Sequence, residues 1–151
     1  MNRLTRLPML FTDHPVYFIT TCTDHRQKLL ADCASHVAFQ QFCLKGRDRG
    51  VFVGRYVLMP DHLHLFVGIP PGEMTLSLWM KSLKNTMSKH WRMKGIEAPH
   101  WQKGFFDHLI RSDESHHEKW RYVRENPVRA GLVCDADDWP FAGNILPDFW
   151  A

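Results

Sequence analysis

The sequence predicts one domain of the α+β class, and three observations support this prediction. A length of 151 residues is enough for a single domain with a sizeable core. Apolar residues make up 44% and charged residues 23% of the chain, as in ordinary globular proteins. Strand-like and helix-like segments follow in the order strand, helix, strand, strand, helix, strand, helix. We expect one domain over 1–151, with 134–151 as an acidic C-terminal tail.

The chain begins its folded part with a strand and a helix. Residues 16–23 are β-branched and aromatic, which is typical of a strand. Residues 32–49 then place apolar side chains at helical spacing, with Asp32 and Ser35 as possible caps. Gly50 stops this helix.

Two further strands follow closely. Side chains of residues 51–59 alternate between the two faces of a strand, and apolar side chains occur on both faces. This pattern predicts a central strand that is buried on both sides. Pro60 and Asp61 interrupt the run. We interpret Asp61 as a turn residue that points away from the face of His62 and His64, with support of these histidines as the alternative. Over 62–69, large aliphatic side chains alternate with the others, which predicts a second strand.

The clearest helix is predicted after Thr75, which can cap it. Apolar side chains recur at helical spacing from Leu76 to Trp91. The segment that ends at Lys94 contains no acidic residue but five basic ones, Lys81, Lys84, Lys89, Arg92 and Lys94. Such a face is either a solvated surface or one that follows DNA phosphates, and we predict that these five residues bind DNA.

A short strand and a last helix complete the domain. Residues 105–110 form the strand, and Ser112 caps the helix, which Asn126 and Pro127 end because proline disfavours helical geometry before it. The remainder is predicted to be a loosely structured tail, in which residues 138–141 could pack back on the domain.

The charge distribution suits a polyanionic partner. The formal net charge is +3, but 134–151 hold four aspartates and no basic residue, which leaves 19 basic and 12 acidic groups elsewhere. Nucleic acid would fit this excess, although many domains carry one as a solvated surface. The four cysteines lack paired spacing, no secretory signal precedes them, and no apolar run approaches roughly 20 residues. We therefore expect a cytoplasmic protein outside the membrane.

Two pairs of residues could carry chemistry. His62 and His64 are two apart on a predicted strand, so both imidazoles face one point, as a divalent cation requires. Tyr122 and Asn126 are four apart near a helix end and share a face. Taken alone, each pair is more often found in ordinary surface or core positions.

Four motifs occur in order along the chain, and their combination is far more specific than any one of them. They are Met59-Pro60-Asp61-His62-Leu63-His64, Trp101-Gln102-Lys103-Gly104, Ile110-Arg111, and a segment from Tyr122 through Asn126-Pro127 to Gly131-Leu132. Over roughly residues 12–141 the chain resembles the single-tyrosine HUH transposases and, within them, the REP-associated tyrosine transposases.

The resemblance implies a ferredoxin-like α+β domain, with a central antiparallel sheet packed with helices and the catalytic tyrosine on a late helix. It implies Tyr122 as the nucleophile and His62, His64 and Asn126 as metal ligands. Because a free phenol is only about 0.1% ionised at neutral pH, its attack needs help, and Mg²⁺ or Mn²⁺ is the expected cofactor.

The implied reaction is cleavage of single-stranded DNA through a 5′-phosphotyrosine intermediate, followed by strand transfer. Single-stranded or hairpin DNA is the implied partner of a monomer or homodimer associated with the bacterial nucleoid.

Two other functions stay open: a catalytically silent DNA-binding module, and a metal-dependent hydrolase in which Tyr122 is incidental. Trp79, Trp91 and Trp101 could stack extruded bases, although the apolar pattern favours core packing for the first two.

Overall fold

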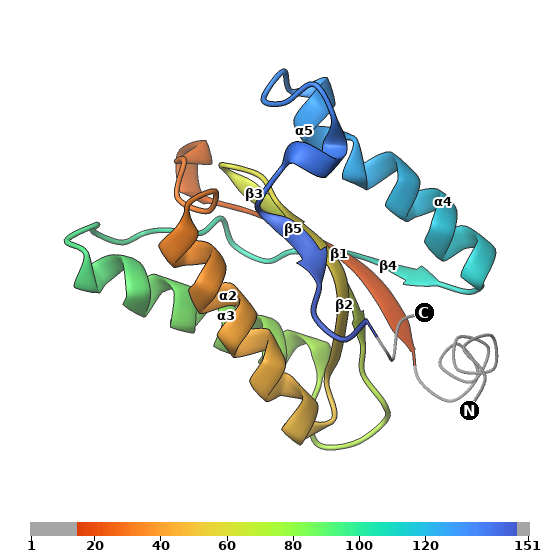
Figure 1. Cartoon of the computed structure of the whole chain (residues 1–151). Helices are drawn as coiled ribbons and strands as arrows, with labels where there is room; N and C mark the ends of the chain where they lie inside the picture. Colours follow the sequence, from red (N-terminus) through yellow and green to blue (C-terminus); the bar gives the residue numbers. More distant parts are fainter. Residues whose placement is uncertain (1–14, 148–151) are drawn as a thin grey trace.

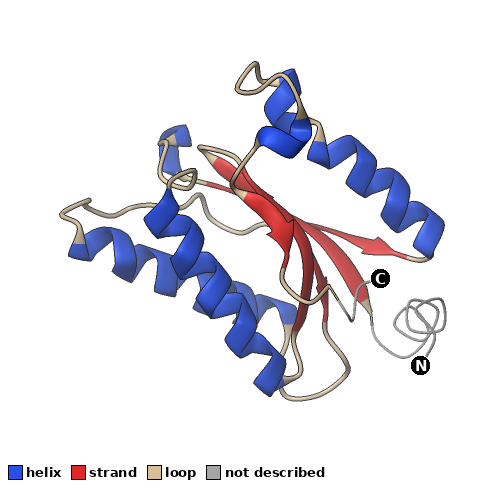
Figure 2. Ribbon diagram, in the orientation of Figure 1, coloured by secondary structure: helices blue, strands red, loops and turns tan. Residues whose placement is uncertain are grey.

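The computed structural model describes residues 15–147, and these form a five-stranded antiparallel sheet with helices on both faces (Figures 1 and 2). The strand order is β4-β1-β3-β2-β5. The strands are β1 (Val16–Cys22), β2 (Phe52–Leu58), β3 (His62–Gly68), β4 (Phe106–Ile110) and β5 (Ala142–Asn144). The predicted ferredoxin-like α+β fold is confirmed. The predicted domain ends, at residues 1 and 151, lie outside the described residues.

The helices begin where local capping predicts. They are α2 (Cys33–Gly46), α3 (Leu76–Met93), α4 (Asp113–Arg124) and the short α5 (Asn126–Arg129), with single 3-10 turns at Asp24–Arg26, Arg47–Arg49 and Ala136–Asp138. The side chains of Asp32, Thr75 and Ser112 each accept a hydrogen bond from the backbone N–H three residues ahead. These bonds satisfy donors that the first helical turn leaves free.

The larger core lies between the sheet and the pair α2 and α3, which run side by side on one face (Figure 1). Trp79 and Trp91 are 2% and 1% exposed in this core. The Trp91 indole donates to Ser35 Oγ at 3.0 Å. Their predicted packing role is confirmed, and neither ring can reach a DNA base.

A smaller core lies under α4, on the opposite face of the sheet (Figure 1). Phe18 and Phe66 come from the sheet, and His116 of α4 is 1% exposed against them. The ring centroids of His116 and Phe66 are 4.3 Å apart. Burial, together with the nearby charges of Arg55 and His117, lowers the pKa of His116 to about 4, against a smaller opposing effect of an acidic residue in α4.

This buried histidine should make stability fall in mild acid. The pKa of His116 in the folded protein lies below its unfolded value of about 6.5. The contribution of neutral His116 to the free energy of unfolding is therefore complete above about pH 6.5 and is lost as pH falls toward about 4. Between about pH 7.5 and about pH 5, the free energy of unfolding should drop by roughly 2 kcal/mol more in the wild type than in His116→Phe. Urea unfolding at both pH values measures this difference. The matched variant His108→Phe, at an exposed histidine, should keep the wild-type difference; an equal loss in both variants would contradict the assignment.

The C-terminal tail is more ordered than predicted. Residues 142–144 form β5 and pair with 55–57 of β2. The Trp139 indole donates to Leu58 O at 2.9 Å, which confirms that this segment packs back on the domain. Gly143 permits the pairing, because a Cβ there would lie 2.9 Å from the Tyr56 hydroxyl oxygen. An Ala-Gly-Asn segment has little strand propensity of its own, so the open edge of β2 determines this strand.

The predicted helix end needs a small correction. Helix α4 ends at Arg124, and Asn126 begins a separate short helix, α5. Pro127 sits in the first turn of α5, where its missing N–H costs nothing. Asn126 therefore lies past a break and not on the helix of Tyr122.

No helix in the described range of the chain is long and apolar enough to cross a bilayer.

Candidate active site

His62 and His64 lie side by side at the start of β3. Their ring centroids are 4.9 Å apart. Leu63 and Leu65, which alternate with them, are buried in the larger core with α2 and α3. Both imidazoles therefore occupy the face that α4 partly covers.

Each imidazole is held through its Nδ1 atom. His62 Nδ1 lies 2.7 Å from Asp61 Oδ1, and His64 Nδ1 lies 2.8 Å from Thr20 Oγ1 on β1. The His64 ring also stacks on Phe18, with centroids 5.4 Å apart. These contacts orient both rings, and the Asp61 carboxylate, which can only accept, favours the His62 tautomer in which Nε2 keeps its lone pair. Within residues 15–147, no side chain is bonded to either Nε2 atom.

The surroundings of His64 keep it neutral. Burial is the main reason that the pKa of His64 falls to about 3. The charges of His62, Lys119, Arg129 and Arg26 lower it further. An imidazole with this pKa is uncharged at neutral pH, and only the uncharged form binds a metal ion.

Tyr122 is exposed at the end of α4, with 66% of its surface accessible. The Arg129 guanidinium lies 4.0 Å from the centroid of the Tyr122 ring and donates to the Tyr122 carbonyl oxygen at 2.8 Å. The same guanidinium donates to the Asn126 side-chain oxygen. Arg129 thus holds Tyr122 and Asn126 together, and its charge also reaches His64.

The residues at this site fit a divalent cation that has open coordination positions. Two imidazoles lie together on one face of the sheet, with Asp61 against the Nδ1 atom of His62. Across residues 15–147, no group of three or more histidine, cysteine, aspartate or glutamate side chains could hold a metal ion. The side-chain oxygen of Asn126, the predicted third ligand, is bonded to Arg129. Its predicted role as a ligand stays a prediction.

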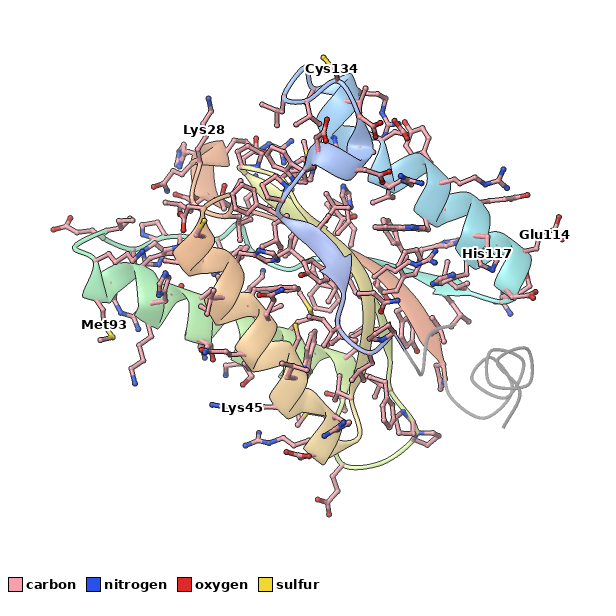
Figure 3. The ribbon with its side chains drawn as sticks, in the orientation of Figure 1. Lys28, Lys45, Met93, Glu114, His117 and Cys134 are labelled. Carbon is pink, nitrogen blue, oxygen red and sulfur yellow. The ribbon has the colours of Figure 1, made fainter. Side chains whose placement is uncertain are left out.

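The four basic residues of α3 and Lys94, which follows its end, do not lie beside the two histidines. Helix α3 packs on the face of Leu63 and Leu65, so its side chains are on the other side of the sheet. In Figure 3, Met93 of α3 and His117 of α4 lie on opposite sides of the sheet. Four of the five basic residues are exposed, namely Lys81, Lys89, Arg92 and Lys94. Any DNA contact they make is remote from the candidate site.

The fifth basic residue, Lys84, has a structural contact. Its ammonium group donates to the carbonyl oxygens of Gln102 and Gly104 and lies 5.8 Å from the Trp101 ring centroid. Partial burial lowers the pKa of Lys84. The Trp101 indole donates back to Lys84 O at 3.1 Å. Hydrogen bonds of Lys84 therefore hold the Trp-Gln-Lys-Gly motif against α3.

Sequence reasoning missed the residues that support the histidines. Asp61 is more than a turn residue: its carboxylate contacts His62 and lies 3.3 Å from Arg26 Nε. Strand alternation did not apply to Asp61, because β3 begins only at His62. Thr20 could be found only from the register that pairs it with His64. Arg129 lay within the last of the four motifs without a role.

A family model described as "Transposase IS200 like" matches residues 13–126, and the chain belongs to this family. The resemblance predicted from the four motifs is confirmed. Escherichia coli K12 has a REP-associated tyrosine transposase that is 30% identical over 70% of this chain and 66% of its own length. A putative REP-associated tyrosine transposase of Haemophilus influenzae is 28% identical over 93% of this chain and 89% of its own. The match thus spans just under two thirds of the E. coli protein.

Solved structures agree with the sequence relatives. A REP-associated tyrosine transposase bound to a REP hairpin matches 85% of this chain and 75% of its own, with a TM-score of 0.70 and 26% identity. A putative transposase from Deinococcus radiodurans, at 17% identity and a TM-score of 0.53, shares the fold.

Proposed function

We propose that this chain cleaves single-stranded DNA and transfers the cut strand, with Tyr122 as the nucleophile. One observation carries the proposal. The Arg129 guanidinium lies 4.0 Å from the centroid of the Tyr122 ring, and the same charge helps to lower the pKa of His64, which supports a site shared by the phenol and the histidine pair. An exposed phenol beside paired imidazoles and several cations suits attack on a phosphodiester.

In the proposed reaction, the Tyr122 phenol oxygen attacks the scissile phosphorus. A bond forms between this oxygen and phosphorus, and the bond from phosphorus to the 3′-oxygen breaks. The phenol proton leaves, and the departing oxygen gains a proton to become a free 3′-hydroxyl. The DNA 5′-end is then held as a 5′-phosphotyrosine. Attack by another 3′-hydroxyl releases Tyr122 and joins the strands, so the phosphodiester bond is conserved without an external energy source.

His62 and His64 would hold a divalent cation in this proposal, with Asn126 as the third ligand. When bound, Mg²⁺ or Mn²⁺ would supply Lewis-acid polarisation of the scissile phosphate. Imidazole suits Mn²⁺ better than the strongly oxygen-preferring Mg²⁺. Asp61 and Thr20 orient the two rings, and Arg129 and Lys119 offset phosphate charge near His64.

The role of Asp61 can be measured through metal dependence. Asp61→Asn keeps the side-chain shape but removes the charge behind His62. It should raise the Mn²⁺ concentration that gives half-maximal cleavage by about 10-fold, and saturating Mn²⁺ should restore the rate. Asp107→Asn, on the exposed edge strand β4, is the matched control and should titrate like the wild type. A lower rate at every Mn²⁺ concentration, with the same midpoint, would argue against an orienting role.

Hairpin-bearing DNA is the proposed substrate, because the solved relative is bound to a REP hairpin. The four basic residues of α3 and Lys94 would then bind duplex phosphates on the far side of the sheet. We propose action on nucleoid DNA in the cytoplasm, as a monomer or homodimer.

The test uses the purified chain, Mn²⁺, and a pool of hairpin-bearing single-stranded DNAs with randomised flanking bases. A protein–DNA species that survives denaturing electrophoresis, with a matching free 3′-hydroxyl fragment, is the expected result. Cleavage without this species would instead support a metal-dependent hydrolase. Hairpin binding without cleavage would support a silent DNA-binding module.

A further inference from the structure

A row of side chains connects His64 to the edge of the sheet. Thr20 of β1 pairs with His64 of β3 on one side and with Phe106 of β4 on the other. Directly opposed residues in antiparallel strands point to the same face, and the hydrogen bond from Thr20 to His64 fixes which face this is. Phe106 therefore lies on the face of the candidate site, two strand spacings, or about 10 Å, from His64.

Phe106 is unusual because it is large, apolar and 76% exposed. Its neighbour Phe105 packs against the larger core on the opposite face, as strand alternation requires. Helix α4 covers the other end of β4, where Ile110 is 3% exposed. The exposed ring of Phe106, at the start of the edge strand β4, therefore lies beside the candidate site.

The charge around this ring favours a nucleic acid strand. Lys119 Nζ lies 5.2 Å from the centroid of the Phe18 ring, which stacks on His64 in the neighbouring row. The charges of Arg129 and Arg26 also reach His64. A single strand whose phosphate lies among these cations must place its adjoining bases on the surrounding surface. Aromatic rings beside a cationic track are the usual platforms for such bases.

We infer that Phe106 stacks a base of the single strand next to the scissile phosphate, so that β4 forms a base-binding shelf beside the candidate site. The inference rests on the proposed function, since it needs DNA at the histidine pair. Stacking on one face of a base requires no hydrogen-bond pattern, so Phe106 positions the strand and does not read its sequence. Phe106 is a binding residue and takes no part in bond breaking.

Photochemical cross-linking tests this contact independently of cleavage. The probe is a single-stranded oligothymidylate of about 16 nucleotides in which 5-iodouracil replaces thymine, because iodouracil cross-links to the aromatic ring on which it stacks. After long-wave irradiation of the full chain, mass spectrometry should find a cross-link at Phe106. Phe106→Ala should lose it and bind the probe about 10-fold more weakly, whereas Phe106→Trp should keep both properties.

The controls separate this inference from the proposed function. Leu78→Ala, at an exposed apolar residue of α3, should bind like the wild type. Cross-links at Tyr122 but not at Phe106, with unchanged binding by Phe106→Ala, would overturn the shelf and leave the proposed function standing. A dimer in sedimentation that Phe106→Ala dissociates would also overturn it, because the ring would then cover a second copy. Failure of every hairpin DNA to give a covalent species would instead sink the proposed function.

Discussion

Tyr122→Phe should abolish the denaturant-resistant protein–DNA species. The change removes one oxygen atom, the atom of this side chain that bonds to phosphorus in the proposed reaction. Loss of a covalent nucleophile commonly costs about 10⁴-fold or more in rate, which takes the adduct below detection. The phenyl ring remains, so its contact with Arg129 and the fold should be preserved. DNA binding should therefore change little.

The chain contains a matched control for this experiment. Tyr17 lies on β1, pairs with Val67 and packs toward the larger core, on the other face of the sheet. Tyr17→Phe makes the same chemical change away from the candidate site and should leave adduct formation intact. An adduct that persists in Tyr122→Phe would exclude Tyr122 as the nucleophile. Loss of the adduct in both variants would point to a general effect on the fold.

His62→Ala should lose metal-dependent cleavage while keeping DNA binding. The change removes one of the two imidazoles and leaves His64 alone at the proposed metal site. Cleavage should fall by at least about 100-fold and should not be restored by added Mn²⁺. The basic side chains that we propose to contact phosphates remain, so affinity for hairpin DNA should stay within roughly threefold and keep its salt dependence.

His90→Ala is the comparison variant, because His90 lies on α3 across the sheet from the site. It should cleave and bind like the wild type. Binding that falls as far as cleavage in His62→Ala would show that the histidine pair maintains the fold. Such a result would argue for a structural site and against a catalytic one.

Local chemistry explains why the sequence predicts the helices well. The caps at Asp32, Thr75 and Ser112 depend only on residues within one turn, so their hydrogen bonds follow from the sequence alone. The strand of β5 has no such local signal. Its three residues become a strand because β2 has an open edge and because Gly143 fits against Tyr56.

The same distinction applies to the candidate site. The closeness of His62 and His64 follows from strand periodicity, which a sequence contains. The contact of Thr20 with His64 depends on the register of two strands that are 44 residues apart in the chain. The remoteness of the basic α3 depends on which sheet face that helix covers. A single sequence carries neither piece of information, so both required the structure.

The docked tail has a consequence for how far the tyrosine helix can travel. Arg124, at the end of α4, forms a 2.7 Å ion pair with Asp137, and a few residues later the chain is anchored to β2 by Trp139 and β5. The exposed ion pair is weak, but the anchor behind it includes backbone strand bonds. The tail therefore acts as a short tether between the end of α4 and the sheet. To hand its tyrosine to a second copy, the chain would have to break the ion pair of Arg124 with Asp137 and extend residues 125–138, or carry its last strand along with the helix.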